Sequence, residues 1–161
     1  NFEKYVNMYP VEDAAQGEDV GDVSTSSTKK KWVFYSPQTP ASESHVRWRI
    51  AVGVSADGQF GHVSFVNGIS TPRGGTHVTY ITDQIAEALA AKISRRHKDL
   101  KILPSHVKAH LFVVINCLIE NPTFDSQTKE TLTSPVRSYG STCVIPDRVV
   151  SQMLNTLNIE D

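Results

Sequence analysis

One change of hydrophobic period constrains the fold of this chain more than any other feature. Between Val46 and Val54 apolar side chains alternate with other residues, the period of two expected of a strand with one buried face. From Val78 to Ile93 apolar residues instead recur every three or four positions, which predicts an amphipathic helix from about Thr76 onwards. A chain that combines such a strand with such a helix is expected to fold as an α+β domain.

Apolar patterns elsewhere predict the remaining elements of the domain. Strands are expected at 32–35, 46–54, 60–69, 110–119 and 139–144, and helices at 2–9, from 76 into the basic segment 92–98, and from 146 onwards. Because Asp57-Gly58 marks a tight turn, the second and third strands are predicted to pair as a hairpin. Polar residues predict a loop from Glu120 to Ser134.

The length of 161 residues suits one domain with a single core and is too short for two ordinary domains. We therefore expect a single domain over residues 1–161. Since the sequence begins at Asn1 without a methionine, we expect it to be a fragment of a longer protein. Residues 11–44 are expected to form a flexible insertion and loop within the domain, because residues 11–31 contain few apolar side chains to offset their ordering entropy.

Charge and cysteine content exclude several classes of protein. The 16 basic and 17 acidic residues nearly cancel, so net charge predicts no partner, and any nucleic-acid surface would have to be a local basic patch. Cys117 and Cys143 are too few for a disulfide framework and are interpreted as reduced thiols. The longest apolar run, Leu111–Ile119, has about half the roughly 20 residues that a membrane helix needs, so no membrane partner is expected.

The most specific functional signal is the segment Asn121–Glu130, NPTFDSQTKE. It resembles the loop of type IIA DNA topoisomerases in which a Gln-Thr-Lys sequence reaches the nucleotide bound by the preceding ATPase domain. A second run, Val66–Val78, VNGISTPRGGTHV, resembles the family pattern Asn-x-Ile-x-Thr-x-x-Gly-Gly-x-His. Shorter matches follow in the same order: NFEKYVNMY at the start, NCLIENP before the loop and SYGSTCVI after it. The resemblance spans most of the chain except residues 10–44.

This resemblance implies a fold and a place in a larger enzyme. The fold is the transducer domain of a eukaryotic-type DNA topoisomerase II: α+β, with a mostly antiparallel sheet, helices on one face and a left-handed β-α-β crossover, similar to the second domain of a small-subunit ribosomal protein. The complete enzyme would be a homodimer in the nucleus, with organellar and viral origins left open, that uses ATP and magnesium to pass one DNA duplex through another. The isolated chain is expected to be inactive, because the ATP-binding GHKL domain and the DNA-cleaving tyrosine lie elsewhere.

Two residues of the loop are implied to act on ATP. Lys129 would contact the γ-phosphate and stabilise charge in the transition state, and Gln127 would hold its amide near the same phosphate or the attacking water. A charge-assisted hydrogen bond from a lysine ammonium contributes about 1.5–3 kcal/mol. Loss of the phosphate would release this contact and relay hydrolysis to the DNA gate. Without the resemblance, Lys129 would be interpreted as a solvated surface lysine.

A basic cluster near the predicted helix end is the candidate contact with double-stranded DNA. It consists of Lys92, Arg95, Arg96, Lys98 and Lys101. In the clamp of the complete enzyme these side chains would contact phosphates and position DNA without reading its sequence. A solvated helix terminus, favoured by the helix dipole, explains the same residues equally well. Both interpretations stay open at the level of the sequence.

Other patterns carry alternatives. Gly74-Gly75 before His77 could cradle a phosphate at a helix start, but the turn matches neither a P-loop nor a dinucleotide fingerprint, and we interpret it as a strand-to-helix connection. His106 and His110 have a helical metal-ligand spacing, but a strand is expected to begin near His110 and no metal site is predicted.

Rival functions are a non-catalytic nucleic-acid-binding module of ribosomal-protein-like fold and another GHKL ATPase, and the Gln-Thr-Lys loop argues against both.

Overall fold

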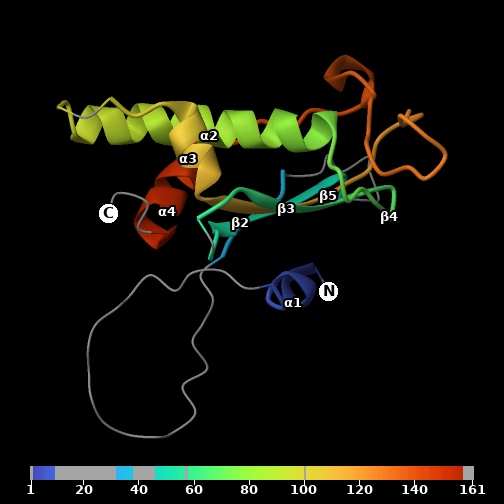
Figure 1. Cartoon of the computed structure of the whole chain (residues 1–161), viewed down its shortest axis with the longest axis horizontal. Helices are drawn as coiled ribbons and strands as arrows, with labels where there is room; N and C mark the ends of the chain where they lie inside the picture. Colours follow the sequence, from blue (N-terminus) through green and yellow to red (C-terminus); the bar gives the residue numbers. More distant parts are fainter. Residues whose placement is uncertain (1, 10–31, 38–45, 57, 100, 158–161) are drawn as a thin grey trace, which may run out of the picture.

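A five-stranded sheet with the order β1-β2-β5-β3-β4 organises the chain (Figure 1). This computed structural model describes residues 2–9, 32–37, 46–56, 58–99 and 101–157. The strands are β1 (Val33–Tyr35), β2 (Trp48–Val54), β3 (Gly61–Val66), β4 (Ile69–Ser70) and β5 (Leu111–Cys117). Three of the neighbouring pairs, β1-β2, β2-β5 and β3-β4, are antiparallel, while β3 and β5 run parallel. The expected α+β domain with a mostly antiparallel sheet is therefore confirmed.

The predicted hairpin between the second and third strands is wrong, because β5 lies between β2 and β3 and pairs with both. The reason is the composition of β5. Five of its seven residues are buried, including Val113 and Val114, which point to opposite faces of the sheet. A strand that is apolar on both faces is most stable at the centre of a sheet, so β5 separates two strands that are neighbours in sequence.

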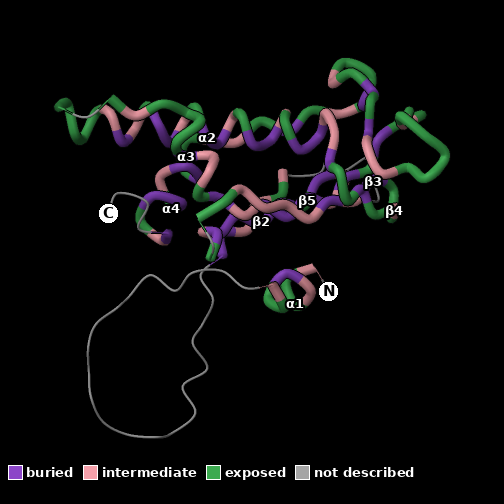
Figure 2. Tube along the Cα trace, in the orientation of Figure 1, coloured by how far each residue is buried: buried purple, intermediate pink, exposed green. Residues whose placement is uncertain are grey.

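Three helices cover one face of the sheet and bury the main core against it (Figures 1 and 2). They are α2 (Thr76–Arg96), α3 (Pro104–Ala109) and α4 (Asp147–Leu157). The predicted period of α2 is confirmed, because Ile81, Ile85 and Leu89 are fully buried. Helix α3 was not predicted from the sequence, since it has six residues and buries only Val107. In the described part of the chain, none of the helices is both long and apolar enough to cross a membrane.

The short helix α1 (Phe2–Val6) lies on the opposite face of the sheet (Figure 1). Its Val6 packs in a second cluster with Trp32, Ala51 and Val114. The prediction that the helices share one face thus holds for α2, α3 and α4 and is wrong for α1. The physical reason is that the central strands bury residues on both faces, so the second face also needs an apolar cover.

Two further predictions concern the segments 139–144 and 11–44. The predicted strand at 139–144 is absent from this described segment; Tyr139 and Cys143 are buried there as irregular chain, after a short 3-10 helix, η1 (Val136–Ser138). Within the expected insertion 11–44, residues 33–35 form the edge strand β1, while residues 11–31 and 38–44 lie outside the described residues. The hand of the crossover from β3 through α2 and α3 to β5 stays a prediction.

Both cysteines are free and buried. Cys117 lies in β5 and Cys143 lies in the irregular segment before α4. Burial raises the pKa of each thiol to about 12. Both therefore act as protonated, unreactive core residues.

Candidate functional site

The two candidate regions lie at opposite ends of α2 (Figure 1). The loop Glu120–Ser134, which carries Gln127 and Lys129, lies beside the start of the helix at Thr76. The basic cluster lies around the other end of the helix, at Arg96. A helix of 21 residues is about 30 Å long, so the structure does not bring the two sets of cations together.

The Gln-Thr-Lys sequence forms an exposed turn at the tip of the loop. The backbone N–H of Lys129 donates to the carbonyl of Ser126 over 3.2 Å, and the hydroxyls of Ser126 and Thr128 lie 2.6 Å apart. Lys129 has φ of 55°, in the left-handed region that lysine rarely adopts. Gln127, Thr128 and Lys129 are all exposed. The three side chains therefore extend into solvent from a backbone held by hydrogen bonds within the turn.

The C-terminal root of the loop is held by the glycine turn before α2. Leu132 donates its N–H to the carbonyl of Gly74 and accepts a bond at its own carbonyl from the N–H of Thr76, each over 3.1 Å. A Cβ on Gly75 would lie 2.4 Å from the Leu132 carbonyl oxygen, and this glycine has φ of 140°. The glycines therefore allow close backbone approach, and the first N–H of α2 is already used. These contacts support the interpretation of the turn as a connection over that of a phosphate cradle.

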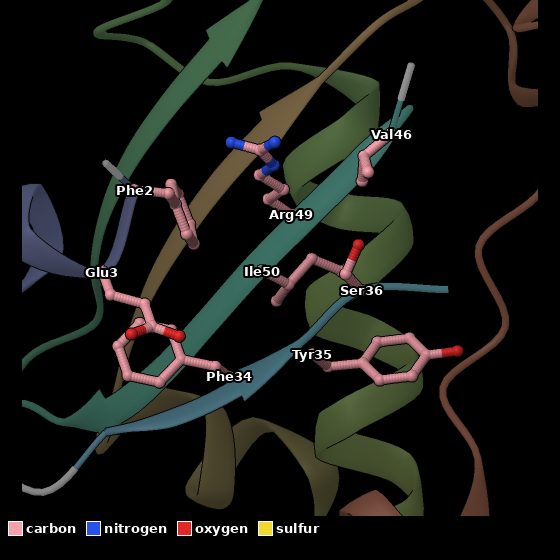
Figure 3. A pocket seen from close by; sticks show the side chains of 8 residues that line it. All are labelled: Phe2, Glu3, Phe34, Tyr35, Ser36, Val46, Arg49 and Ile50. Carbon is pink, nitrogen blue, oxygen red and sulfur yellow. The ribbon is translucent and has the colours of Figure 1, made fainter. Parts of the chain in front are cut away.

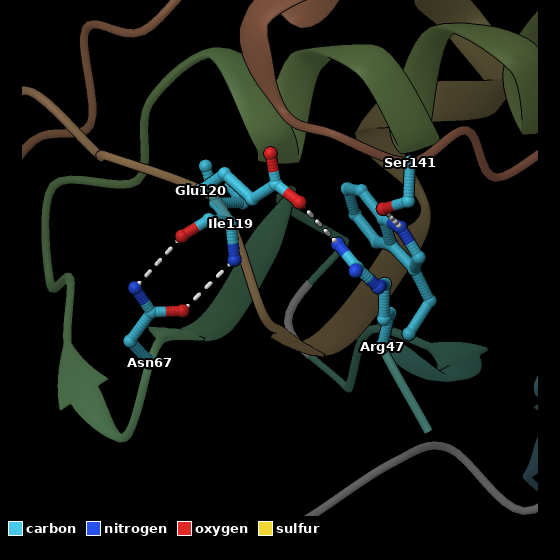
Figure 4. A network of polar contacts seen from close by, with 6 residues as sticks. Arg47, Asn67, Ile119, Glu120 and Ser141 are labelled. Atoms are coloured by element: carbon cyan, nitrogen blue, oxygen red, sulfur yellow. Dashed lines mark hydrogen bonds and ion pairs between the residues drawn. The ribbon is translucent and has the colours of Figure 1, made fainter. Parts of the chain in front are cut away.

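The N-terminal root of the loop is held by Asn67, in the turn between β3 and β4 (Figure 4). Its amide nitrogen donates to the carbonyl of Ile119 over 2.9 Å, and its side-chain oxygen accepts from the N–H of Ile119 over 2.8 Å. The next residue, Glu120, pairs with Arg47 at 3.3 Å. Asn67 was not predicted as a site residue, although it lies in the matched run 66–78.

His77 joins the start of α2 to the sheet rather than facing a ligand. It is fully buried, and its Nε2 lies 3.2 Å from the hydroxyl of Thr71, which in turn lies 2.6 Å from that of Ser64. Burial lowers the pKa of His77 from 6.5 to about 4, with a smaller contribution from His62. The imidazole is therefore neutral at physiological pH, so it cannot supply a positive charge to a phosphate.

At the other end of α2, an ion pair sets Lys92 apart from the other residues of the basic cluster. Lys92 has only 20% of its side chain exposed, and its Nζ lies 3.0 Å from a carboxylate oxygen of Asp147 in α4. Side chains beyond it are exposed: Arg95, Arg96, Lys98 and Lys101. The structure therefore gathers four of the five predicted DNA contacts on the surface, while Lys92 connects α2 to α4.

A shallow groove of about 500 Å³ lies away from both regions, between α1 and the first two strands (Figure 3). Phe2, Phe34 and Ile50 give it apolar walls, and Arg49 lies at its side. None of the predicted site residues lines this groove. Across the described residues, no group of three or more histidine, cysteine or acidic side chains is arranged to hold a metal ion.

Comparison with known proteins identifies relatives over nearly the whole chain. Residues 1–158 match the family model described as DNA gyrase B. The chain is 39% identical over 159 residues to the mitochondrial DNA topoisomerase 2 of Dictyostelium discoideum, covering 99% of this chain and 12% of that protein. It is also 39% identical to DNA topoisomerase 2 of Saccharomyces cerevisiae, covering 97% of this chain and 10% of that protein. The chain thus spans about a tenth of the length of these relatives.

Solved structures agree with these matches. The crystal structure of the ATPase and transducer domains of DNA topoisomerase II from Balamuthia mandrillaris is similar with a TM-score of 0.79 and 40% identity, over 99% of this chain and 34% of that one. The ATPase region of Saccharomyces cerevisiae topoisomerase II is similar with a TM-score of 0.68 and 38% identity, over 80% of this chain and 30% of that one.

Proposed function

Because this chain belongs to the DNA gyrase B family, we propose that it is the transducer domain of an ATP-dependent, eukaryotic-type II DNA topoisomerase. Its similarity to crystal structures of the ATPase region of such enzymes supports the proposal. In the complete enzyme the domain couples ATP hydrolysis to the DNA gate during duplex strand passage. We propose that the isolated chain has no activity of its own, because the nucleotide on which its loop acts would be bound by the preceding GHKL domain.

The observation that carries the proposal is the contrast between the tip and the roots of the loop. The tip displays Gln127 and Lys129 to solvent, and neither side chain forms a hydrogen bond or ion pair with another of the described residues. The roots are fastened through Asn67 on one side and Leu132 on the other. An exposed cation on a fixed base suits contact with a ligand held by a neighbouring domain.

The role of the loop follows from the chemistry of phosphoryl transfer. Lys129 donates from its ammonium to an oxygen of the γ-phosphate of ATP bound on the preceding GHKL domain, whose three equatorial oxygens share the negative charge of the transferred phosphoryl group. Gln127 orients the attacking water or the same phosphate through its amide. When the phosphate leaves, the anion that holds the loop is lost, and the domain is free to move against its neighbour.

The described residues include no group of three or more histidine, cysteine or acidic side chains arranged to hold a magnesium ion. We therefore assign the ion to the triphosphate and the GHKL domain, and no step here depends on it. The second partner is double-stranded DNA, whose phosphates Arg95, Arg96, Lys98 and Lys101 contact at the far end of α2. The complete enzyme is proposed to act as a homodimer in the nucleus. Because one relative is mitochondrial, an organelle is the alternative location.

Replacement of the loop lysine tests the proposal. In the complete enzyme, Lys129→Ala should lower the rate of ATP hydrolysis by about 10²–10³-fold, the usual loss when a preorganised donor to a developing charge is removed. The same change at the exposed Lys4, in α1 on the opposite face of the sheet, is the matched control and should leave turnover unchanged. Near-normal ATP turnover of Lys129→Ala would contradict the role assigned to the loop.

A further inference from the structure

The side chain of Lys129 has a partner within its own loop. Its Nζ lies 5.9 Å from the centroid of the Phe124 ring, within the roughly 6 Å over which a cation is attracted to an aromatic face. We propose that Phe124 is a positioning residue for Lys129. The Phe124 ring holds the Lys129 ammonium at the edge of the loop until the ammonium meets a phosphate. The inference rests on the proposed role of Lys129 and adds a residue that acts on ATP only through that lysine.

Phe124 can serve as a fixed support because its own position is well determined. It forms a bridge with Leu132, which is buried at the root of the loop. One residue to either side, the N–H of Thr133 donates to the carbonyl of Thr123 over 2.8 Å. The ring is half-buried and packs against the main core. Phe124 therefore belongs to the rigid base of the loop, whereas Lys129 belongs to its exposed tip.

The backbone at the tip gives the lysine a defined starting point. Lys129 has φ of 55°, a conformation that a lysine keeps only where surrounding contacts enforce it. Here the enforcing contacts are the 3.2 Å bond from its N–H to the carbonyl of Ser126 and the 2.6 Å contact between the hydroxyls of Ser126 and Thr128. Backbone and ring together limit the directions that the ammonium can take.

Such a support would matter because a free lysine side chain loses rotamer freedom when it binds one phosphate. A side chain that is already restricted loses less rotamer entropy on binding. A larger share of the free energy of the charge-assisted hydrogen bond then stabilises the transition state. The ring does not compete with the substrate, since an exposed cation–π contact is weaker than an ammonium–phosphate hydrogen bond. Phe124 is therefore expected to raise the turnover rate without entering the nucleotide site.

Fluorination of the ring tests the electrostatic part of this proposal in the complete enzyme. Phenylalanine analogues with increasing fluorine content at position 124 keep the shape of the ring while they weaken its attraction for a cation. The maximal rate of ATP hydrolysis should fall in steps, by roughly two- to fivefold over the series. Phe124→Tyr keeps an electron-rich ring and should retain the normal rate. A rate that is insensitive to fluorination would overturn the proposal.

A double-mutant cycle separates positioning from a general effect on structure. Phe124→Leu should lower turnover when Lys129 is present and have no further effect in the Lys129→Ala background. An equal loss in both backgrounds would show that Phe124 acts independently of the lysine and would refute the inference alone. Normal turnover of the Lys129→Ala variant by itself would instead contradict the role proposed for Lys129. Failure of the inference on Phe124 and failure of the proposed function can therefore be distinguished.

Discussion

The two ends of α2 both carry exposed cations, but they are built in different ways. At the Thr76 end, backbone and side-chain hydrogen bonds fasten both roots of the loop that displays Lys129. At the Arg96 end, basic side chains follow one another on the helix terminus and the segment after it, and an ion pair with Asp147 holds Lys92 at the base of the cluster. One region presents a single cation at a defined place, and the other presents several over a wider surface.

This difference matches the ligands proposed for the two ends. A terminal phosphate in a nucleotide site occupies one position, so a lysine that meets it gains from a fixed backbone. A DNA duplex presents a continuous row of phosphates, so several exposed cations can bind it in more than one register. If the comparison is correct, substitutions at the loop end should cost stability, while substitutions at the basic end should change mainly the affinity for DNA.

The largest loss of stability is expected from Gly75→Ala. The new Cβ would meet the Leu132 backbone at 2.4 and 2.6 Å at a φ of 140°, so the glycine turn and the loop root would have to separate. We expect the free energy of unfolding to fall by about 3 kcal/mol in chemical denaturation. Gly68→Ala is the matched control, because Gly68 also has a positive φ but has open space around it, and should cost about 1 kcal/mol. Equal losses would show that the loop root is not held by this close contact.

A smaller, pH-dependent loss should come from His77 at the same end. Its folded-state pKa of about 4 lies below the ordinary 6.5, so the unfolded chain takes up a proton first as the pH falls. The stability that depends on neutral His77 is fully present above pH 6.5 and is lost as the pH falls towards 4. Between pH 7 and 5 the loss should be about 2 kcal/mol, measured by urea denaturation at each pH.

The control for this pH dependence is a pair of substitutions. His77→Gln should remove most of the loss between pH 7 and 5 and leave only the smaller part due to His62, whose pKa burial also lowers, whereas the same change at the exposed His106 should leave the profile as it is. A wild-type profile that is retained by His77→Gln would mean that another group carries the pH dependence.

Much of the fold was predictable, because α2 buries apolar residues at helical spacing and β2 and β5 are short segments rich in buried apolar residues. Strand pairing was not, since the position of β5 between β2 and β3 depends on which strand buries both faces best. The loop was found by its resemblance to a known family. Its supports could not be identified in advance, because the contacts of Asn67 and Leu132 join segments far apart in the chain and the contact of Phe124 with Lys129 depends on the folded shape of the loop.

The smallest effects are expected at the basic end. Lys98→Gln should leave the free energy of unfolding unchanged but reduce the slope of log affinity against log salt for DNA by about 0.9, the loss of one phosphate contact. Lys92→Gln should do the opposite: it removes the pair with the largely exposed Asp147, costs at most about 1 kcal/mol, and leaves the salt slope as it was. If Lys92→Gln reduced the slope as much as Lys98→Gln, the division of the cluster would be wrong.

The separation of the two ends is tested most directly by ATP turnover of the complete enzyme with and without DNA, in two variants. Lys129→Ala should lower turnover in both conditions, because the loop acts on the phosphate itself. Charge reversal at the other end, Arg95→Glu with Lys98→Glu, should leave basal turnover intact and remove most of its stimulation by DNA. The account would be contradicted if the charge-reversed enzyme responded normally to DNA, or if Lys129→Ala hydrolysed ATP at the normal basal rate.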